Sequence, residues 1–441
     1  MLSLFLHMRK ILAFNINSVE DFRRKCIEFA RQFDTFILLD SHSDKLEKVS
    51  KYAEFDMIAA AGQVCSTSLN YCNFSELRNF TNSINDWRFG HFSFNLQTET
   101  EGIISENENL IGFPDLFFFQ PKWFFILKGN QAELQYLPNI TEYEAITLVE
   151  KFNNPTNQAF QHINKEIIEC RTNEKDYLNI VNQLKWHISR GDIYEVNFCI
   201  EFFSKNYNLD PYKTYLLLSS HSPAPFASFY KLNDKFLICS SPERYLRKLG
   251  STIISQPIKG TAARGFNPDE DKIIVNNLVH SKKERAENIM ITDLVRNDLS
   301  KTAVSGSVKV DELCSIYSFK HVHQMISTVS AKLDEKQHFT NAIKNSFPMG
   351  SMTGAPKHSA LKIVNQFESF NRGLFSGSVG YIAPSNDFDF NVVIRSILYN
   401  STNKYLSIPA GSAITSYCEP EKEYEECLLK AKALLEVLKV V

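Results

Sequence analysis

Apolar residues in this 441-residue chain occur in short runs separated by turn residues. The runs Phe36–Leu39 and Trp123–Leu127 have the length of buried strands, and Lys128-Gly129-Asn130 ends the second of them. No apolar run approaches the length that is needed to span a membrane. We therefore expect a core that is built from many short strands.

Beyond about residue 165, strand and helix patterns alternate, which predicts a mixed α and β fold with large antiparallel sheets. The predicted helices are Lys175–Arg190, stopped by Gly191, then Lys272–Val295 and Glu421–Val440. The predicted strands are Tyr194–Phe203, Phe226–Tyr230, Phe236–Cys239, Gly380–Ile382 and Phe390–Leu398. The asparagine-rich segment Asn153–Asn164 is expected to join two regions, 1–165 and 166–441.

The chain is nearly neutral, with 48 basic and 50 acidic residues, which gives no electrostatic case for binding nucleic acid or a membrane surface. An anionic ligand would have to be held by a few placed cations. The nine cysteines form no Cys-x-x-Cys pair, which argues against structural zinc and a disulfide framework. The apolar stretch Met1–Leu6 is too short for the core of a signal peptide. These features favour a cytoplasmic protein with free thiols.

Lys259 lies between Pro257-Ile258 and Gly260, sixteen positions after Glu243. A lysine that is fixed between a proline and a glycine can be a substrate anchor, a surface charge or a nucleophile. The residue alone leaves these three roles open.

Two pairs of glutamates recur at the same spacing: Glu284 with Glu287, and Glu423 with Glu426. Residues three apart on a helix project from one face, so four acids on two helices can converge on one hard cation such as Mg²⁺. The same spacing also suits an ordinary solvated helix face.

The glycine-rich segment Phe347–Lys357 invites comparison with a phosphate-binding loop. That loop needs a lysine directly after its last glycine, whereas Ala355-Pro356 separates Gly354 from Lys357. We instead expect a tight turn that presents Ser351, followed by a helix that begins near Pro356. A plain strand-to-helix turn remains the alternative.

Three further residues suit the binding of an anion. Arg395 follows the apolar stretch Phe390–Ile394, and its guanidinium suits bidentate capture of a carboxylate. Gly411 permits close approach of the backbone to a ligand. Lys430 lies one helical turn after Glu426 and is either its ion-pair partner or a second anion contact.

Taken in order, these segments resemble the chorismate-utilising enzymes, a family that includes anthranilate synthase component I, aminodeoxychorismate synthase component I, and the isochorismate and salicylate synthases. The resemblance runs from about Lys175 to the C-terminus. It is weaker in the first third, where Leu38–Ser41 resembles a segment near the tryptophan pocket of some relatives. The matching motifs are Gly191–Asn197, Ser241–Arg244, Pro257–Thr261, Arg285–Asn288, Asp293–Asp298, Gly354–Lys357, Gly377–Tyr381, Asn391–Arg395 and Glu423–Glu426.

The resemblance implies an α+β fold of four layers, α/β/β/α, in which two antiparallel sheets pack face to face. Region 1–165 would be the strand-rich N-terminal part, and region 166–441 would bind chorismate. The resemblance further implies that Glu243 is the general acid that protonates the departing C4 hydroxyl of chorismate, for which its pKa must be raised. The implied ligands of Mg²⁺ are Glu284, Glu287, Glu423 and Glu426. The implied contacts to the substrate's carboxylates are Ser351, Arg395, Gly411 and Lys430.

Lys259 indicates which member of the family the chain is similar to, because aminodeoxychorismate synthases carry Pro-Ile-Lys-Gly-Thr and anthranilate synthases usually have alanine there. In the aminodeoxychorismate synthases this lysine attacks C2 of chorismate, and ammonia then enters at C4 and expels the lysine. Such a nucleophile must be neutral, so we expect burial to lower the pKa of Lys259. The alternative is that Lys259 only pairs with a nearby carboxylate.

The chain departs from the family pattern at Ala262-Ala263, which replaces an arginine-proline pair without an evident consequence, and at three further positions. Glu195 stands where most relatives have glutamine and where the water-using members have a lysine base, which disfavours an isochorismate or salicylate synthase. Gln324 replaces a histidine that is linked to pyruvate elimination in anthranilate synthase, and an amide cannot act as that base. Phe375 replaces a tyrosine near the substrate's side chain, so one hydroxyl contact is lost.

The expected product is 4-amino-4-deoxychorismate, on the route to 4-aminobenzoate and folate. No cysteine has a Gly-x-Cys-x-Gly setting, so a glutamine amidotransferase in a separate chain, or free ammonia, is the expected nitrogen source. The alternatives are anthranilate synthase component I and a non-catalytic chorismate-binding subunit.

Overall fold

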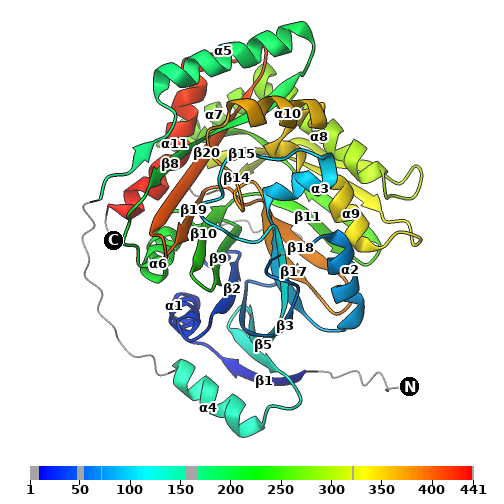
Figure 1. The fold of residues 1–441 in the computed structure, drawn as a ribbon. Coiled ribbons are helices and arrows are strands. Elements are labelled where there is room, and N and C mark those ends of the chain that lie inside the picture. Colours follow the sequence, from blue (N-terminus) through cyan, green and yellow to red (C-terminus); the bar gives the residue numbers. More distant parts are fainter. Residues whose placement is uncertain (1–8, 47–53, 71, 154–165, 320–321, 440–441) are drawn as a thin grey trace.

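The computed structural model describes residues 9–46, 54–70, 72–153, 166–319 and 322–439 (Figure 1). Three parts of the sequence-based expectations lie outside these ranges: the apolar Met1–Leu6, the expected junction beyond Asn153, and Val440 at the end of the last predicted helix. Among the described residues, no helix is both long and apolar enough to cross a bilayer.

The described residues alternate between helices and short strands. The helices are α1 Val19–Ala30, α2 Phe74–Ser83, α3 Gln97–Glu101, α4 Glu142–Asn153, α5 Glu174–Arg190, α6 Pro211–His221, α7 Pro268–His280, α8 Lys282–Ser300, α9 Phe339–Ser346, α10 Lys357–Phe367 and α11 Pro420–Leu438, with 3₁₀ turns η1 Phe94–Leu96 and η2 Gly350–Met352. The strands are β1 Lys10–Asn15, β2 Thr35–Asp40, β3 Met57–Ser66, β4 Arg88–Phe92, β5 Leu116–Lys128, β6 Gln131–Tyr136, β7 Glu169–Cys170, β8 Glu195–Ser204, β9 Phe226–Leu232, β10 Lys235–Ser241, β11 Arg244–Leu249, β12 Thr252–Gln256, β13 Ile258–Ala263, β14 Lys309–Ser318, β15 Val322–Lys332, β16 Gly354–Ala355, β17 Ser378–Ile382, β18 Phe388–Asn391, β19 Ser396–Asn400 and β20 Tyr405–Ile414.

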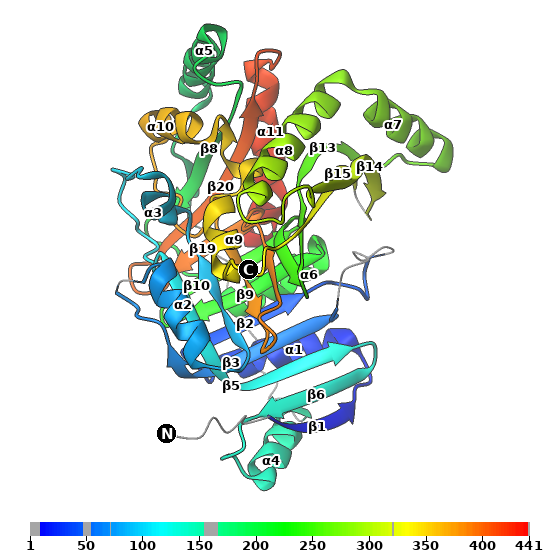
Figure 2. The ribbon, with the colours of Figure 1, turned by 90° about the vertical axis from the view of Figure 1, so that its right-hand side faces the viewer.

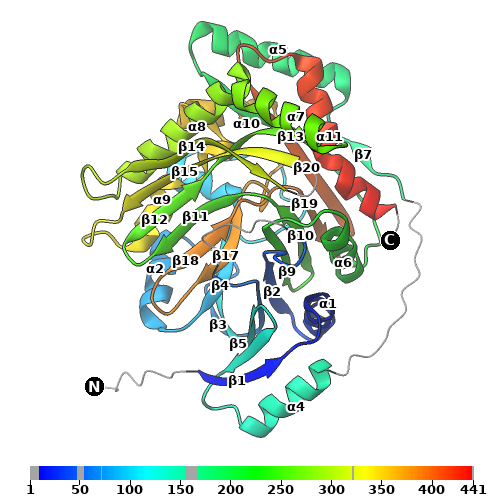
Figure 3. The ribbon, with the colours of Figure 1, turned by 180° about the vertical axis from the view of Figure 1, so that it is seen from behind.

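The strands form two antiparallel sheets that share the long strand β5. One edge of β5 pairs with β3, and its other edge is divided between β4, along 116–119, and β6, along 123–128. The first sheet runs β1-β6-β5-β3-β2-β9-β10-β19-β20-β8, and the second runs β5-β4-β17-β18-β11-β12-β15 (Figure 3). Strands β7 and β16 extend the first sheet beside β8, and β13 and β14 flank β15. The expected α+β fold with antiparallel sheets is confirmed.

Alternation along the strands places the core on both sides of the first sheet. On β2, Phe36 and Leu38 join a cluster that includes Phe22 of α1. Ile37, which points the other way, joins a second cluster that includes Phe390 of the second sheet. Helices α8 and α9 lie beside the second sheet, and α8 packs on β13, β14 and β15 (Figure 2). The layers are thus helix, sheet, sheet and helix.

Two elements differ from the sequence-based expectation. The single helix predicted over Lys272–Val295 is two helices, α7 and α8, which are separated by Ser281. The Ser281 side chain caps α8 by accepting a hydrogen bond from the Glu284 backbone N–H. The strand predicted over Phe390–Leu398 is interrupted after Asn391. Arg395 lies in that interruption with a left-handed φ of 51°, so it follows a loop rather than a strand. The prediction was wrong at both places, whereas the helix ended by Gly191, at φ 82°, is confirmed.

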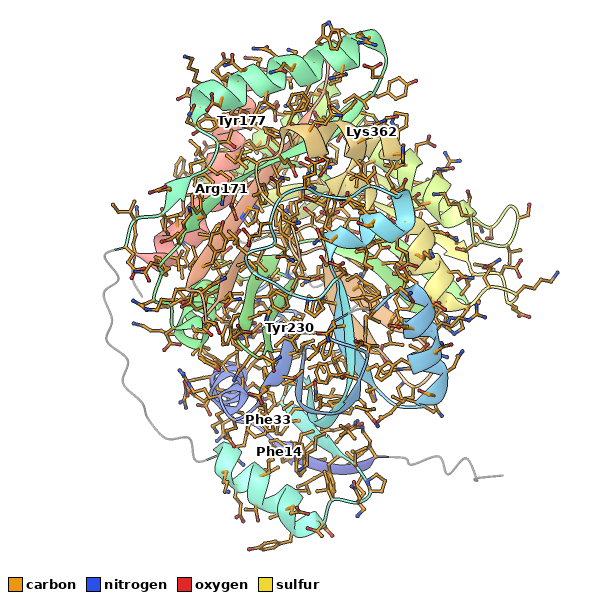
Figure 4. The ribbon with its side chains drawn as sticks, viewed as in Figure 1. Phe14, Phe33, Arg171, Tyr177, Tyr230 and Lys362 are labelled. Carbon is orange, nitrogen blue, oxygen red and sulfur yellow. The ribbon has the colours of Figure 1, made fainter. Side chains whose placement is uncertain are left out.

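Strand pairs cross the expected boundary near residue 165, since β2 pairs with β9 and β4 pairs with β17. The division into regions 1–165 and 166–441 therefore stays a prediction about function, within one connected strand network. On the far side of the first sheet, Tyr177 of α5 lies near the top of the view in Figure 4, and its hydroxyl lies 2.7 Å from Ser412 Oγ. This contact anchors α5 to β20.

Candidate active site

Lys259 of β13 and Glu195 of β8 form an ion pair at the centre of the predicted site, with 3.0 Å between Lys259 Nζ and Glu195 Oε1. The Glu195 side chain is 1% exposed and that of Lys259 is 12% exposed. Burial acts to lower the pKa of Lys259, but the carboxylates of Glu195, Glu287 and Glu243 outweigh it and hold that pKa above its usual value. The expectation of a lowered pKa is wrong, because the carboxylates near Lys259 outweigh its burial.

Glu243 lies between β10 and β11 and is 4% exposed. Burial raises the pKa of the Glu243 carboxyl to about 7, although its side-chain contact with Ser351 and the charge of Lys259 oppose this. A carboxyl group with such a pKa keeps a substantial share of its proton near neutral pH. Glu243 therefore has the protonation that a general acid requires.

The glycine-rich segment brings Ser351 to this acid. Strand β16 pairs with the start of β8, where the Asn197 N–H donates to Thr353 O at 2.8 Å. A Cβ at Gly354 would lie 2.2 Å from the Glu195 carbonyl oxygen, so only glycine allows this approach. The segment is followed by α10, which begins at Lys357, as predicted.

Helix α8 packs over β13 through Asn288, a residue to which sequence reasoning gave no role. The Asn288 amide donates to Lys259 O at 3.2 Å and to Met325 O at 3.0 Å, and its oxygen accepts from Ser327. A Cβ at Gly260 would lie 3.0 Å from Glu284 Oε2. Asn288 thus fixes Lys259 relative to the helix that carries two of the acids. Its position within the motif Arg285–Asn288 was the available signal.

The four acids of α8 and α11 lie near one another and beside two lysines. Lys283 Nζ lies 2.8 Å from Glu423 Oε1, and Lys430 Nζ lies 2.6 Å from Glu426 Oε1. Burial raises the pKa of Glu284 and of Glu423, with mutual repulsion among the acids adding to it, and raises the pKa of Glu287 to about 8. Glu426 is different, because Lys430 outweighs burial and lowers its pKa.

Among the described residues, no group of three or more His, Cys, Asp or Glu side chains is arranged as a metal site. Glu423 and Glu426 are each paired with a lysine instead. Glu287 Oε1 is nevertheless buried without a hydrogen-bond partner in the described part of the chain. A donor set made only of carboxylate oxygens suits a hard divalent cation.

Arg395, Lys430 and Gly411 form the other side of the site. Arg395 donates to Lys430 O at 3.4 Å, and Lys430 Nζ donates to Gly411 O at 2.7 Å. Burial lowers the pKa of Arg395, while the charge of Glu426 opposes this. A Cβ at Gly411 would lie 2.5 Å from Cys199 Sγ, so this position also requires glycine. The three anion-binding candidates are therefore brought together.

The two remaining candidates lie in different settings. Gln324 of β15 pairs with Thr261, two residues beyond Lys259, and its Oε1 is buried with no partner among the described residues. Phe375 is 2% exposed and belongs to the hydrophobic cluster between the sheets. Its role toward a substrate stays a prediction.

A separate cavity lies beside the start of β11, next to the link that carries Glu243. It is lined by Asp40 and Ser41 of the segment that resembles the surroundings of a tryptophan pocket, and by Phe226, Arg244 and Tyr381. Arg244 is paired with Asp389 at 2.8 Å. None of the candidate site residues lines this cavity.

Comparison with known proteins identifies the class to which this site belongs. The family model described as chorismate binding enzyme matches residues 34–436, and the chain belongs to that family. Probable chloroplastic aminodeoxychorismate synthase of Oryza sativa is 39% identical over 63% of this chain, and an anthranilate synthase component I-like protein of Synechocystis is 35% identical over 74%. The crystal structure of anthranilate synthase component I from Streptococcus pneumoniae has the same fold, with a TM-score of 0.70 and 21% identity, and covers 98% of this chain and 93% of its own.

The matched region spans 31% of the length of the Oryza relative and 67% of the length of the Synechocystis relative. The family and the fold are therefore shown for this chain. The reaction, the metal and the partner are inferences from the site.

Proposed function

We propose that this chain converts chorismate and ammonia to 4-amino-4-deoxychorismate, as the component of an aminodeoxychorismate synthase that binds chorismate. The observation that carries the proposal is the placement of Lys259 within 3.0 Å of Glu195 and beside Glu243, whose pKa of about 7 suits a general acid. Relatives named aminodeoxychorismate synthase, such as that of Oryza, support the same reaction.

The chemistry needs two events at the substrate ring. Lys259 attacks C2 while Glu243 donates its proton to the C4 hydroxyl, which leaves as water. Ammonia then adds at C4, the lysine amine is expelled from C2, and Glu243 takes back a proton from the new ammonium group. Covalent catalysis of this kind replaces one difficult substitution by two easier ones.

Mg²⁺ is the proposed cofactor, held by Glu284 and Glu287 of α8 and by Glu423 and Glu426 of α11. When bound, it would supply positive charge to hold a carboxylate of chorismate. The raised pKa values of Glu284, Glu287 and Glu423 support this assignment, because a divalent cation relieves the repulsion between buried carboxylates. Binding requires Lys283 and Lys430 to release Glu423 and Glu426.

Arg395, Lys430 and Ser351 are the proposed contacts to the substrate's other charged and polar groups, and the Gly411 backbone is a further proposed contact. The Arg395 guanidinium is only partly neutralised by nearby carboxylates, so it is suited to bind a carboxylate of the ligand. Gln324 and Phe375 would border the substrate. We also propose a reducing compartment such as the cytoplasm, which agrees with nine cysteines that are all free.

Nitrogen would come from a glutamine amidotransferase in a separate chain or from free ammonia. Anthranilate synthesis is the second candidate, favoured by the name of the Synechocystis relative. Gln324 argues against it, since an amide cannot serve as the base for pyruvate elimination.

The test is to incubate the protein with chorismate, Mg²⁺ and ammonium, with and without aminodeoxychorismate lyase, and to identify the products by mass spectrometry. We expect aminodeoxychorismate alone, and 4-aminobenzoate when the lyase is added. Anthranilate without the lyase would replace the proposal by the second candidate. Intact chorismate at high ammonium would indicate a non-catalytic subunit.

A further inference from the structure

Glu195 has a free carboxylate oxygen beside the lysine that is proposed to react. Its Oε1 pairs with Lys259 Nζ at 3.0 Å, and its Oε2 is buried with no hydrogen-bond partner among the described residues. The side chain is 1% exposed, so bulk water does not serve this oxygen. A buried carboxylate oxygen that is left unsatisfied is costly and calls for an explanation in function.

The backbone holds Glu195 firmly in this place. Ala355 of β16 pairs with Glu195 in register, and the neighbouring Gly354 packs directly on the Glu195 carbonyl oxygen. Lys259 is fixed from the other side through its own carbonyl, which accepts from Asn288. The short distance between the two side chains is thus set by two independently anchored strands.

We propose that Glu195 is the acid–base partner of Lys259: it accepts the ammonium proton when Lys259 attacks C2 and returns that proton when Lys259 is expelled. This inference rests on the proposed function and deepens it. It assigns a catalytic step to a residue that has no step of its own in the two events described above.

The proton balance closes over the cycle. Lys259 begins as an ammonium group, and its proton moves to Glu195, which leaves a neutral amine and a carboxylic acid. The amine forms a bond to C2 as the C4 oxygen departs with the proton of Glu243. After ammonia enters at C4 the bond to C2 breaks, and Glu195 gives its proton back to the released amine.

Five carboxyl groups interact electrostatically with Lys259: Glu195 from β8, Glu243 from the link between β10 and β11, Glu284 and Glu287 from α8, and Glu426 from α11. Glu243 must arrive with its own proton to release the C4 hydroxyl, and the three acids of α8 and α11 are proposed metal ligands. Among the carboxyl groups of the described residues, that of Glu195 is the one within ion-pair distance of Lys259. Because it is close to Lys259 and the other acids have other roles, Glu195 is the proposed acceptor of the Lys259 proton.

The test begins with the wild-type protein, which must form aminodeoxychorismate from chorismate, Mg²⁺ and ammonium; failure here would refute the proposed function itself. In Glu195→Gln, the amine has to lose its proton to solvent. We expect kcat at pH 7 to fall by about 10²-fold, in line with the usual contribution of an acid–base group. Glu243 titrates in both proteins, so the ratio of the variant's kcat to the wild-type kcat should rise with pH up to pH 9.

Two further variants serve as controls for Glu195→Gln. Glu195→Asp keeps a carboxylate, so it should be slower than the wild type by a factor that does not change with pH. Glu201→Gln removes another buried carboxylate of β8, which pairs with Arg171 at 2.7 Å, and should leave the pH profile unchanged. Chorismate binding and thermal unfolding are measured for all variants to confirm folding.

If the wild type is active, either of two results would overturn the proposed role of Glu195. The first is a Glu195→Gln variant with wild-type kcat and pH profile. The second is a Glu195→Asp variant whose kcat, relative to the wild type, rises with pH as steeply as that of Glu195→Gln, since the retained carboxylate would then be irrelevant.

Discussion

Lys283 of α8 lies 2.8 Å from Glu423 of α11, so an ion pair joins the two helices that carry the proposed metal ligands. Lys430 pairs with Glu426 at 2.6 Å in the same region. Each lysine neutralises a carboxylate that would otherwise face its neighbours uncompensated. Side-chain cations therefore hold two of the acids in place, and a metal ion must compete with them.

Mg²⁺ is expected to stabilise the protein and to weaken the dependence of its stability on pH. The pKa of Glu287 in the folded protein is about 8, above its value in the unfolded chain. The contribution of Glu287 to the free energy of unfolding is therefore complete below about pH 4.5 and is lost as pH rises through 8. Without metal, the melting temperature should thus fall between pH 6 and pH 8. Mg²⁺ at about 100 times its Kd should add about 2.7 kcal/mol and flatten this fall, as measured by thermal unfolding with and without chelator.

Glu287→Gln and Glu423→Gln should weaken Mg²⁺ binding in isothermal titration, by at least tenfold. The matched control is Glu425→Gln, which changes an exposed glutamate on the same helix as Glu423. Equal Mg²⁺ affinity in all three variants would place the metal elsewhere.

The pH dependence of turnover should report Glu243. A general acid is active only when it is protonated, and burial raises the pKa of Glu243 to about 7. We therefore expect kcat/KM for chorismate to be constant below this pKa and to decline tenfold per unit above it. Glu243→Gln should lose activity at every pH while it still binds chorismate. A decline that persists in Ser351→Ala with an unchanged midpoint would argue against the Ser351 contact.

Lys259→Ala and Lys259→Arg separate the two roles that the ion pair with Glu195 leaves open. A nucleophile cannot be replaced by a guanidinium, so both variants should lose amination by about 10²-fold or more. Lys259→Arg keeps the positive charge and should melt near the wild-type temperature, whereas Lys259→Ala leaves the acids uncompensated and should melt lower. Substantial amination by Lys259→Arg would return Lys259 to a purely electrostatic role.

Gly260→Ala should harm the site more than its matched control, Gly250→Ala. Both glycines have positive φ, 93° and 58°, so alanine strains the backbone at each. At Gly260 the added Cβ also lies 3.0 Å from Glu284 Oε2, while at Gly250 nothing lies within 4 Å. A larger loss of Mg²⁺ affinity in Gly260→Ala is expected, by isothermal titration. Equal losses would mean that the contact with Glu284 is tolerated.

Local patterns in the sequence were sufficient for most single elements. The apolar runs of β2 and β8 and the glycine stop of α5 gave correct predictions because each depends on neighbours in the chain. The helix break at Ser281 was missed although its signal was present. Ser281 and Glu284 have the spacing of a capping box, but the helical periodicity continues across it.

The electrostatics of the site could not be predicted in the same way. Lys259, Glu195, Glu243 and Glu287 come from four elements that are distant in sequence, and the pKa of Lys259 depends on the sum of their charges. Reasoning from burial alone gave the wrong direction for that pKa. Arg395 was likewise expected after a strand, because nothing in its apolar neighbours reveals the left-handed turn.

Strand β5 serves both sheets, with β3 on one edge and β4 and β6 on the other. A strand that is common to two sheets cannot detach from one of them and leave the other intact. The N-terminal third is consequently expected to melt together with the rest in one cooperative transition. A fragment that starts at residue 166 would leave the edges of β9 and β17 bare, and unpaired edges invite self-association.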